Sequence, residues 1–149
     1  MGRLYNRARD PAAFRILAGD DVSGSLDSLR GHKYAVLVSF RRTGEPVPSP
    51  IWVAVDTQGR AYVQTGRASG KVKRIRNNSQ VLIAASTARG KPTGPVLSGT
   101  ARVLPKEEWA HSETTLASNF GLGRWLYLRA FRTSDDALAY VEITPRDAS

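Results

Sequence analysis

Short apolar runs rich in β-branched and aromatic residues recur along the chain from residue 33 onward, and turn residues separate them. The runs 34–40 (YAVLVSF), 47–56 (VPSPIWVAVD) and 61–65 (AYVQT) are bounded by the turns RTGE and TQGR. Such runs predict β-strands, and the short turns between them predict an antiparallel meander. Pro48 and Pro50 place the first half of the second strand at a sheet edge, because proline donates no backbone hydrogen bond.

The spacing of the apolar residues changes at residues 69–77 (SGKVKRIRN), where Val72 and Ile75 are three residues apart. This spacing predicts a short helix with an apolar stripe and basic residues on its other faces, and Ser69 is the expected N-cap. Strand patterns return at 81–86 (VLIAAS) and 95–104 (PVLSGTARVL). Gly99, in the middle of the second run, predicts a bulge or a bend.

A longer helix is predicted over residues 105–120, because proline suits a first helical turn and two glutamates follow it. This helix is expected to bury Trp109, Leu116 and Phe120. Residues 123–131 (GRWLYLRAF) fit a helix or a strand, and we favour a helix. Residues 137–143 (ALAYVEI) alternate between two faces and predict the closing strand.

Together these elements predict a mainly β protein, in which an antiparallel sheet closes into a small barrel with helices at its mouth. Residues 1–28 mix helix and turn signals and are expected to form a partly ordered lead-in, followed by one domain over 29–149. A length of 149 residues agrees with a single domain. The chain has no signal-peptide core and no apolar stretch of membrane-spanning length, which predicts a cytoplasmic protein without a membrane partner.

The composition excludes several kinds of catalytic and metal-binding site. The chain has no cysteine, which excludes disulfides, thiolate metal ligands and catalytic thiols. Its two histidines, His32 and His111, have no carboxylate at metal-ligand spacing, and a solvated position is expected for both. A GxSxG motif is also absent, so any chemistry is expected to belong to a bound cofactor.

The net charge of +9 is unevenly distributed. Residues 57–106, which we call the acid-free span, contain ten of the 22 basic residues and no acidic residue. Such a span favours an anionic partner, which could be nucleic acid, an acidic membrane surface or a phosphorylated small molecule. A basic surface that only aids solubility is the alternative. Nucleic acid is disfavoured because Tyr62 is the only aromatic residue in the span, whereas stacking platforms need several.

The segment 65–76 (TGRASGKVKRIR) is the strongest local candidate for chemistry. A predicted strand ends there, a glycine-containing turn follows, and a helix begins. Free N–H groups at the helix start, the Ser69 hydroxyl and the Lys71 ammonium would together bind a phosphate. A solvated basic helix is the alternative. The segment lacks the GxxxxGK[ST] pattern of a nucleotide P-loop.

The order of these segments, with SGKVKRIRNN after a strand that ends in threonine and ARGKPTGP before another strand, resembles the split-barrel flavin and deazaflavin oxidoreductases. This superfamily includes pyridoxamine 5′-phosphate oxidase, and the branch that the chain resembles depends on coenzyme F420, a deazaflavin. The resemblance covers residues 29–145. It implies a six-stranded antiparallel split β-barrel of the FMN-binding type that forms a homodimer, with a cofactor at each of two interface sites.

The resemblance also implies which residues hold the cofactor. Phosphate contacts fall on Ser69 and Lys71, and Thr65, Arg67 and Arg74 lie nearby. Backbone N–H groups of the run Pro48, Ser49, Pro50, Ile51 and Trp52 would surround the pyrimidine edge of the cofactor ring. Arg89 and Gly90, and Arg124 or Trp125 from a second subunit, would line the rest of the cavity.

The implied function is an oxidoreductase that passes a hydride from reduced coenzyme F420 to an electrophilic small molecule. The acid-free span suits this cofactor, because its phosphodiester and polyglutamate tail carry more negative charge than the phosphate of FMN. Alternatives in the same fold are an FMN-dependent oxidoreductase and a protein that binds a flavin or deazaflavin without turnover. Vitamin B6 oxidation is not expected, because the basic C-terminal motif of the pyridoxamine phosphate oxidases is missing. Ser49, Tyr62 and Thr65 are possible proton donors.

Overall fold

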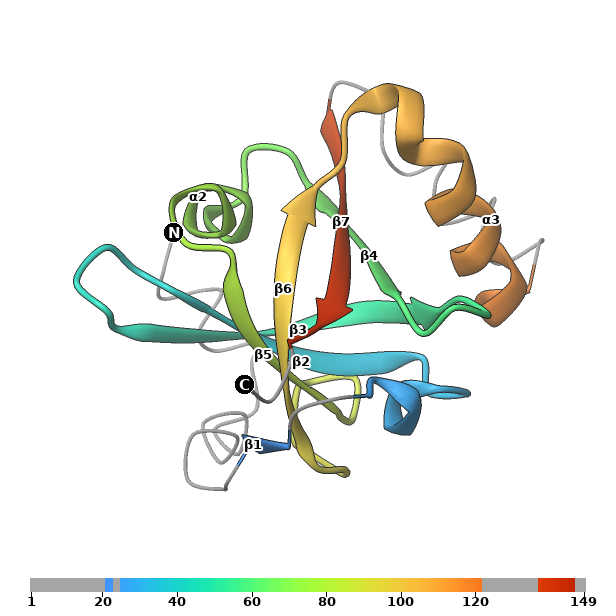
Figure 1. The fold of residues 1–149 in the computed structure, drawn as a ribbon, viewed down its shortest axis with the longest axis horizontal. Helices are drawn as coiled ribbons and strands as arrows, with labels where there is room; N and C mark the ends of the chain where they lie inside the picture. Colours follow the sequence, from blue (N-terminus) through green and yellow to red (C-terminus); the bar gives the residue numbers. More distant parts are fainter. Residues whose placement is uncertain (1–20, 23–24, 122–136, 147–149) are drawn as a thin grey trace.

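Six antiparallel strands close into a barrel (Figure 1). The computed structural model describes residues 21–22, 25–121 and 137–146. The barrel strands are β2 (Tyr34–Phe40), β3 (Pro46–Val55), β4 (Ala61–Gly66), β5 (Gln80–Ala85), β6 (Val96–Val103) and β7 (Leu138–Pro145). They follow the order β6-β5-β2-β3-β4-β7, and pairing between β6 and β7 closes the ring. This arrangement confirms the predicted mainly β, six-stranded split barrel, with strand ends within two residues of those expected.

Successive side chains along each strand point alternately into the barrel and toward its outer surface. On β2, Ala35 and Leu37 belong to the interior core, whereas Val36 and Val38 pack in a second apolar cluster on the outer face. The interior is filled by small and branched apolar side chains from all six strands. This pattern explains why the β2 run is apolar at nearly every position, since both of its faces are buried.

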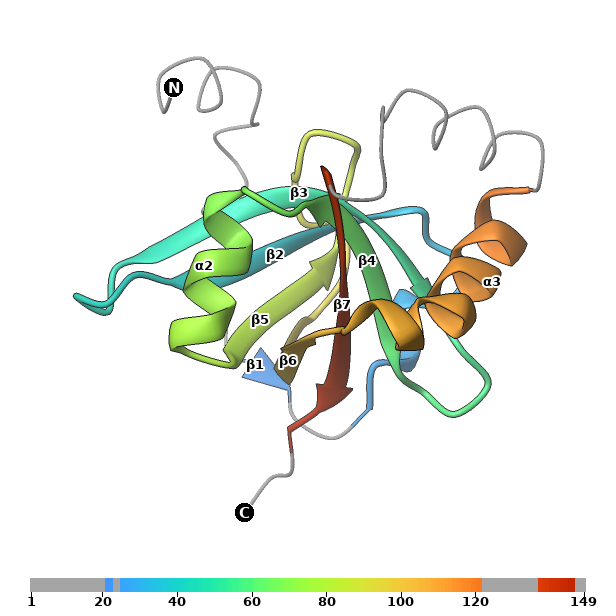
Figure 2. The ribbon, with the colours of Figure 1, turned by 90° about the horizontal axis from the view of Figure 1, so that it is seen from above.

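Two helices lie at different places on the barrel (Figures 1 and 2). Helix α2 (Gly70–Asn77) follows β4 and buries Val72 and Ile75, the two residues of its predicted stripe. Helix α3 (Trp109–Phe120), after the 3-10 turn η3 (Lys106–Glu108), packs on the outer faces of β3 and β4. The predicted core residues of α3 are confirmed, because Trp109, Leu116 and Phe120 are all buried.

Gly99 does not form the expected bulge. The register between β5 and β6 runs without a break from Gln80↔Thr100 to Ile83↔Leu97, and that between β6 and β7 is equally regular. A Cβ atom at Gly99 would lie 2.6 Å from Ile143 Cγ2 and 3.2 Å from the carbonyl oxygen of Thr144. The glycine therefore provides room for a side chain of β7.

Two short elements lie near the N-terminal end of the described chain. Strand β1 (Asp21–Val22) pairs in parallel with Val96–Leu97 of β6, and a 3-10 turn, η2 (Asp27–Leu29), contributes Leu29 to the core. The predicted helix over 123–131 and most of the predicted lead-in lie outside the described residues. None of the described helices has both the length and the apolar character needed to cross a membrane.

Candidate functional site

The seam between β3 and β4 brings two of the predicted site segments to one region. These strands pair only at Val53↔Val63, Ala54↔Tyr62 and Val55↔Ala61, whereas β3 pairs with β2 along seven positions. Ile51 and Thr65 each lie two residues beyond the last pair of this seam. The run 48–52 and the turn that leads from β4 into α2 therefore border the same end of the seam.

The prolines of β3 determine which backbone groups face this opening. The N–H of Val53 donates to the carbonyl of Lys33 at 3.1 Å, which makes the odd-numbered positions of β3 the hydrogen-bonded ones toward β2. Consequently the N–H groups of Ser49 and Ile51 point at β2. Pro48 and Pro50 face the outer edge, where they have no N–H to offer. Of the run 48–52, only Trp52 directs an N–H toward that edge, which corrects the expectation of several backbone donors there.

Side chains of this run alternate in the same way. Ile51 is buried in the interior core, and the Ser49 hydroxyl is fully buried without a hydrogen-bond partner among the described residues. Trp52 faces outward and stacks on Phe120 of α3, with ring centroids 4.9 Å apart. An outer-surface ligand would therefore meet Pro50 and Trp52, whereas Pro48 is buried and Ser49 would not contact the ligand through its hydroxyl.

The start of α2 gathers the predicted phosphate residues. Ser69 occupies the N-cap position, but its hydroxyl does not cap the helix and lies 3.4 Å from the Thr65 hydroxyl. Lys71 is the second residue of the helix, and the first turn contains no acidic side chain. The Ser69 side chain therefore makes no capping hydrogen bond to the N–H groups of the first helical turn.

Arg74 adds a second cation at this helix start. Its Nε donates to the hydroxyl of Ser39 on β2 at 2.6 Å, and Ser39 is fully buried. A Cβ atom on Gly70 would lie only 2.6 Å from Arg74 Nη1, so the guanidinium rests against the Cα of Gly70. Sequence reasoning missed Ser39, although a serine at an inward-facing position of an otherwise apolar strand was a usable signal.

This arrangement is electrostatically suited to an anion. A helix start carries a partial positive charge, and cations placed there are unfavourable unless negative charge is supplied. Lys71 and the Arg74 guanidinium both lie at this start, and the first turn of α2 contains no acidic residue. The donor set of hydroxyl, ammonium, guanidinium and helix N–H groups fits a phosphate. Among the described residues, no three metal-ligating side chains cluster together.

Arg67 lies beside this helix start, whereas Arg89 and Gly90 are not brought to it within one chain. Arg67 lies on the exposed turn before α2, and its N–H donates to the carbonyl of Ala137 at 3.0 Å. Arg89 and Gly90 belong to the loop between β5 and β6, which lies at the bottom of Figure 1, whereas the start of α2 lies near the top. Arg124 and Trp125 lie outside the described residues.

A separate polar cluster forms under α3. The Asp56 carboxylate accepts hydrogen bonds from the N–H groups of Gln58 and Arg60, each at 2.9 Å, and lies 2.9 Å from His111 Nε2. Burial alone would raise the Asp56 pKa, but the bonds to His111, Arg60 and Gln58 outweigh it and lower the pKa to about 2. His111 is exposed, as expected, with 55% of its side chain accessible, and its contact with the buried Asp56 carboxylate was not anticipated.

Tyr62 is part of the same cluster and is not placed to donate a proton at the candidate site. Its hydroxyl donates to Glu142 at 3.0 Å, and the ring is buried under α3. Burial and the neighbouring carboxylate of Glu142 raise the pKa of Tyr62 well above its usual range. Of the three possible proton donors, only Thr65 borders the start of α2.

Comparisons with known proteins agree with this architecture. The sequence pattern of the family described as pyridoxamine 5′-phosphate oxidase matches residues 26–148. None of the curated proteins is similar enough in sequence to match the chain.

Several solved structures share the fold at low sequence identity. A pyridoxamine 5′-phosphate oxidase-like protein from Listeria innocua is 18% identical, with a TM-score of 0.57 over 82% of this chain and 90% of that one. A haem storage protein from Vibrio cholerae is 14% identical, with a TM-score of 0.61 over 78% and 84% of the two chains. A FAD-binding protein from Mesorhizobium loti is 15% identical, with a TM-score of 0.55 over 81% and 84%.

Proposed function

The chain belongs to the pyridoxamine 5′-phosphate oxidase family of split barrels, and from this premise we propose that it is a coenzyme F420-dependent oxidoreductase. In this proposal the reduced cofactor passes a hydride to an electrophilic small molecule. The observation that carries the proposal is the start of α2, where the Ser69 hydroxyl, Lys71 and the Arg74 guanidinium lie together beside a first helical turn that contains no acidic residue. The basic residues of the acid-free span beyond that site favour a cofactor with more negative charge than FMN.

The roles of the chain's own residues follow from their positions. Ser69 and Lys71 would bind the cofactor phosphate, with Arg74 held beside them by its bond to Ser39. The partly exposed side chains of Pro50 and Trp52 would lie beside the planar ring. The bound deazaflavin supplies the hydride chemistry, and the protein orients the ring and the substrate.

We further propose that the protein is a homodimer with the cofactor at the interface. One chain separates the β5–β6 loop, which carries Arg89 and Gly90, from the start of α2. A second copy would allow the loop of one subunit to complete the site of the other. Sedimentation velocity should then give a dimer near 32 kDa, twice the 16.3 kDa of one chain. A species of 16.3 kDa at micromolar protein concentration would contradict this proposal.

The cofactor proposal is tested by titrating the purified protein with coenzyme F420 and FMN side by side, following the absorbance and fluorescence of each cofactor. We expect tighter binding of coenzyme F420. Lys71→Ala should weaken its binding by at least tenfold, since a hydrogen bond to a charged group contributes about 1.5–3 kcal/mol. Lys33→Ala is the matched control, because Lys33 is an exposed lysine outside the acid-free span. Absence of coenzyme F420 binding at micromolar concentration would exclude the proposal.

The alternative is a protein of the same fold that uses FMN or FAD, or that binds a cofactor without turnover. The similarity to structures described as a FAD-binding protein and a haem storage protein supports keeping it. Tighter binding of FMN in the same titration would favour a flavin. Cofactor binding without hydride transfer to any acceptor would favour the non-catalytic form.

A further inference from the structure

A groove runs between α2 and the C-terminal end of β6, beside the anion site. It consists of two adjoining cavities of about 190 and 440 Å³. Both are lined by Arg76 and by the run Val103, Leu104 and Pro105, and we call the two adjoining cavities together the α2–β6 groove.

The floor of the α2–β6 groove is apolar. Trp109, Leu104 and Leu138 are buried residues whose surfaces close its deeper part, and Ile75 closes the side toward α2. This floor can remove an apolar molecule from water, which is the main favourable contribution to binding in such pockets.

The rim of the groove is cationic. Arg67, Arg76 and Lys106 line it, and no acidic side chain belongs to either cavity. Within the described part of the chain, neither Arg67 nor Arg76 makes an ion pair. Two cations without an ion pair beside one cavity, Arg67 and Arg76, repel each other unless an anion lies between them.

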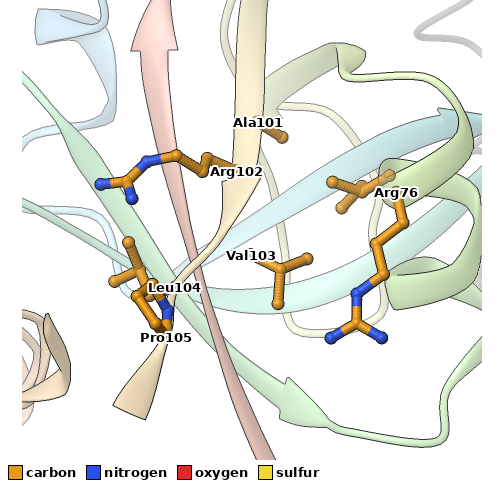
Figure 3. Close-up of a pocket in the computed structure, with 7 residues that line it drawn as sticks. Arg76, Ala101, Arg102, Val103, Leu104 and Pro105 are labelled. Atoms are coloured by element: carbon orange, nitrogen blue, oxygen red, sulfur yellow. The ribbon is translucent and has the colours of Figure 1, made fainter. Parts of the chain in front are cut away.

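Arg102, the fourth basic residue of the groove lining, is turned away. Figure 3 shows its side chain on the opposite side of β6 from Arg76. There it pairs with Glu108 at 2.9 Å and with Glu142 at 3.3 Å. The structure thus neutralises the cation that points out of the groove, whereas Arg76 has no acidic partner among the described residues.

We propose that the α2–β6 groove binds a small molecule that combines an apolar body with a carboxylate, sulfonate or phosphate group. The apolar body lies on Trp109 and Leu104, and the anionic group lies between Arg76 and Lys106. Because Ser69 and Lys71 do not line either cavity, this site is separate from the proposed phosphate site, although Arg67 lies between the two.

The test is a fluorescence titration of the full chain with 1-anilinonaphthalene-8-sulfonate, an aromatic anion, and with N-phenyl-1-naphthylamine, its uncharged counterpart. Arg76→Ala should weaken binding of the sulfonate about tenfold, the effect of losing one partly solvated contact to a charged group. It should change binding of the uncharged probe less than twofold. Lys73→Ala, an exposed change on the same helix outside the groove, should leave both unchanged. Circular dichroism checks that each variant is folded.

Three results would overturn the proposal. Equal sulfonate affinity in Arg76→Ala and Lys73→Ala would show that the probe binds elsewhere. Displacement of the sulfonate by inorganic phosphate as readily as by benzoate would indicate a plain anion site with no use for the apolar floor. Displacement by coenzyme F420 or FMN would make the groove part of the cofactor site. Because cofactor binding is measured in its own titration, failure of the proposed function would be seen separately.

Discussion

Arg74 illustrates how the meaning of a single residue depends on its neighbours. In the sequence it is one of several cations in a basic helix. In the structure its guanidinium is held by the buried Ser39 hydroxyl and rests against Gly70, where any larger residue would displace it. Three residues from β2 and α2 therefore determine where one charge lies.

Substituting Gly70 by alanine tests this arrangement. The new Cβ would lie 2.6 Å from Arg74 Nη1, so the guanidinium must move. Because the end of an arginine side chain is flexible, we expect the free energy of unfolding to change by less than about 1 kcal/mol. Cofactor affinity should nevertheless fall several-fold in a direct titration. Unchanged affinity would show that the position of Arg74 is not used in binding.

Asp56 is the residue from which we expect a clear pH effect. Its folded pKa of about 2 lies below the ordinary value of 3.8, so its ionised form stabilises the fold above about pH 4. At 1.36 kcal/mol per unit, this stabilisation is roughly 2 kcal/mol, and it should disappear as the pH falls from 4 to 2. Asp56→Asn should therefore be less stable at pH 7 by about this amount, with the difference shrinking toward pH 2. Urea unfolding at pH 7, 4 and 2.5 measures it, and a constant difference would contradict the assignment.

At the scale of the element, β6 shows why a glycine stands in an otherwise regular strand. Gly99 lies opposite Val81 of β5 and Pro145 of β7, and both registers pass through it without interruption. Its lack of a side chain lets Ile143 fill the interior at that level of the barrel. The close packing of β6 against β7 therefore requires a residue without a Cβ atom at position 99.

Gly99→Ala should destabilise the barrel by about 1–3 kcal/mol, the usual cost of inserting a methyl group into a packed interior. The close contact with the Thr144 carbonyl oxygen, a backbone atom, limits how far the structure can relax. Gly94→Ala is a suitable control, because its Cβ would meet Ala85 at an ordinary 3.5 Å. Urea midpoints of the two variants compare them, and equal midpoints would refute the packing argument.

At the scale of the whole molecule, the basic residues that give the net charge of +9 are unevenly distributed in space. Of the cations of the acid-free span, Lys71 and Arg74 lie at the start of α2, and Arg67, Arg76 and Lys106 line the α2–β6 groove. Several acidic residues lie on the other side of the barrel, where Glu108 and Glu142 pair with Arg102 and Asp56 pairs with Arg60. Charge separation of this kind favours a localised anionic ligand over an extended one.

Nucleic-acid binding, the remaining alternative for this charge, makes a different prediction. A surface that contacts six to ten phosphates would lose about 10³–10⁵ in affinity between 50 and 200 mM salt. We expect only weak binding of duplex DNA, absent at 200 mM salt, whereas cofactor binding should persist there. Fluorescence anisotropy with a labelled duplex measures this. Submicromolar DNA binding at 200 mM salt would favour the nucleic-acid alternative.

The local pattern of apolar and turn residues was sufficient to predict much of the fold. The apolar runs and turns predicted all six barrel strands and both longer helices, because burial on one or two faces imposes a period that the residues display. The buried faces of α2 and α3 could be predicted for the same reason. The two-residue β1 could not, since a pairing that short leaves no periodic signal.

The candidate site was less accessible to sequence reasoning. Lys71 and Ser69 could be singled out because they lie next to each other at a helix start. Ser39, the space over Gly70 and the pairing of His111 with Asp56 depend on contacts between residues 35 to 55 positions apart, except that Gly70 and Arg74 are neighbours on one helix. The direction of the N–H groups in β3 depends on its register with β2.

The sequence by itself thus determined the strand and helix content, the likeness to the split barrels and the basic character of residues 57–106, since these follow from local composition and period. Only the tertiary structure decided which of those cations gather at the start of α2, which line the α2–β6 groove and which are neutralised on the far side of β6. The physical reason is that the spacing of apolar residues along the chain determines which residues are buried. The closure of the barrel determines which residues far apart in the sequence come into contact.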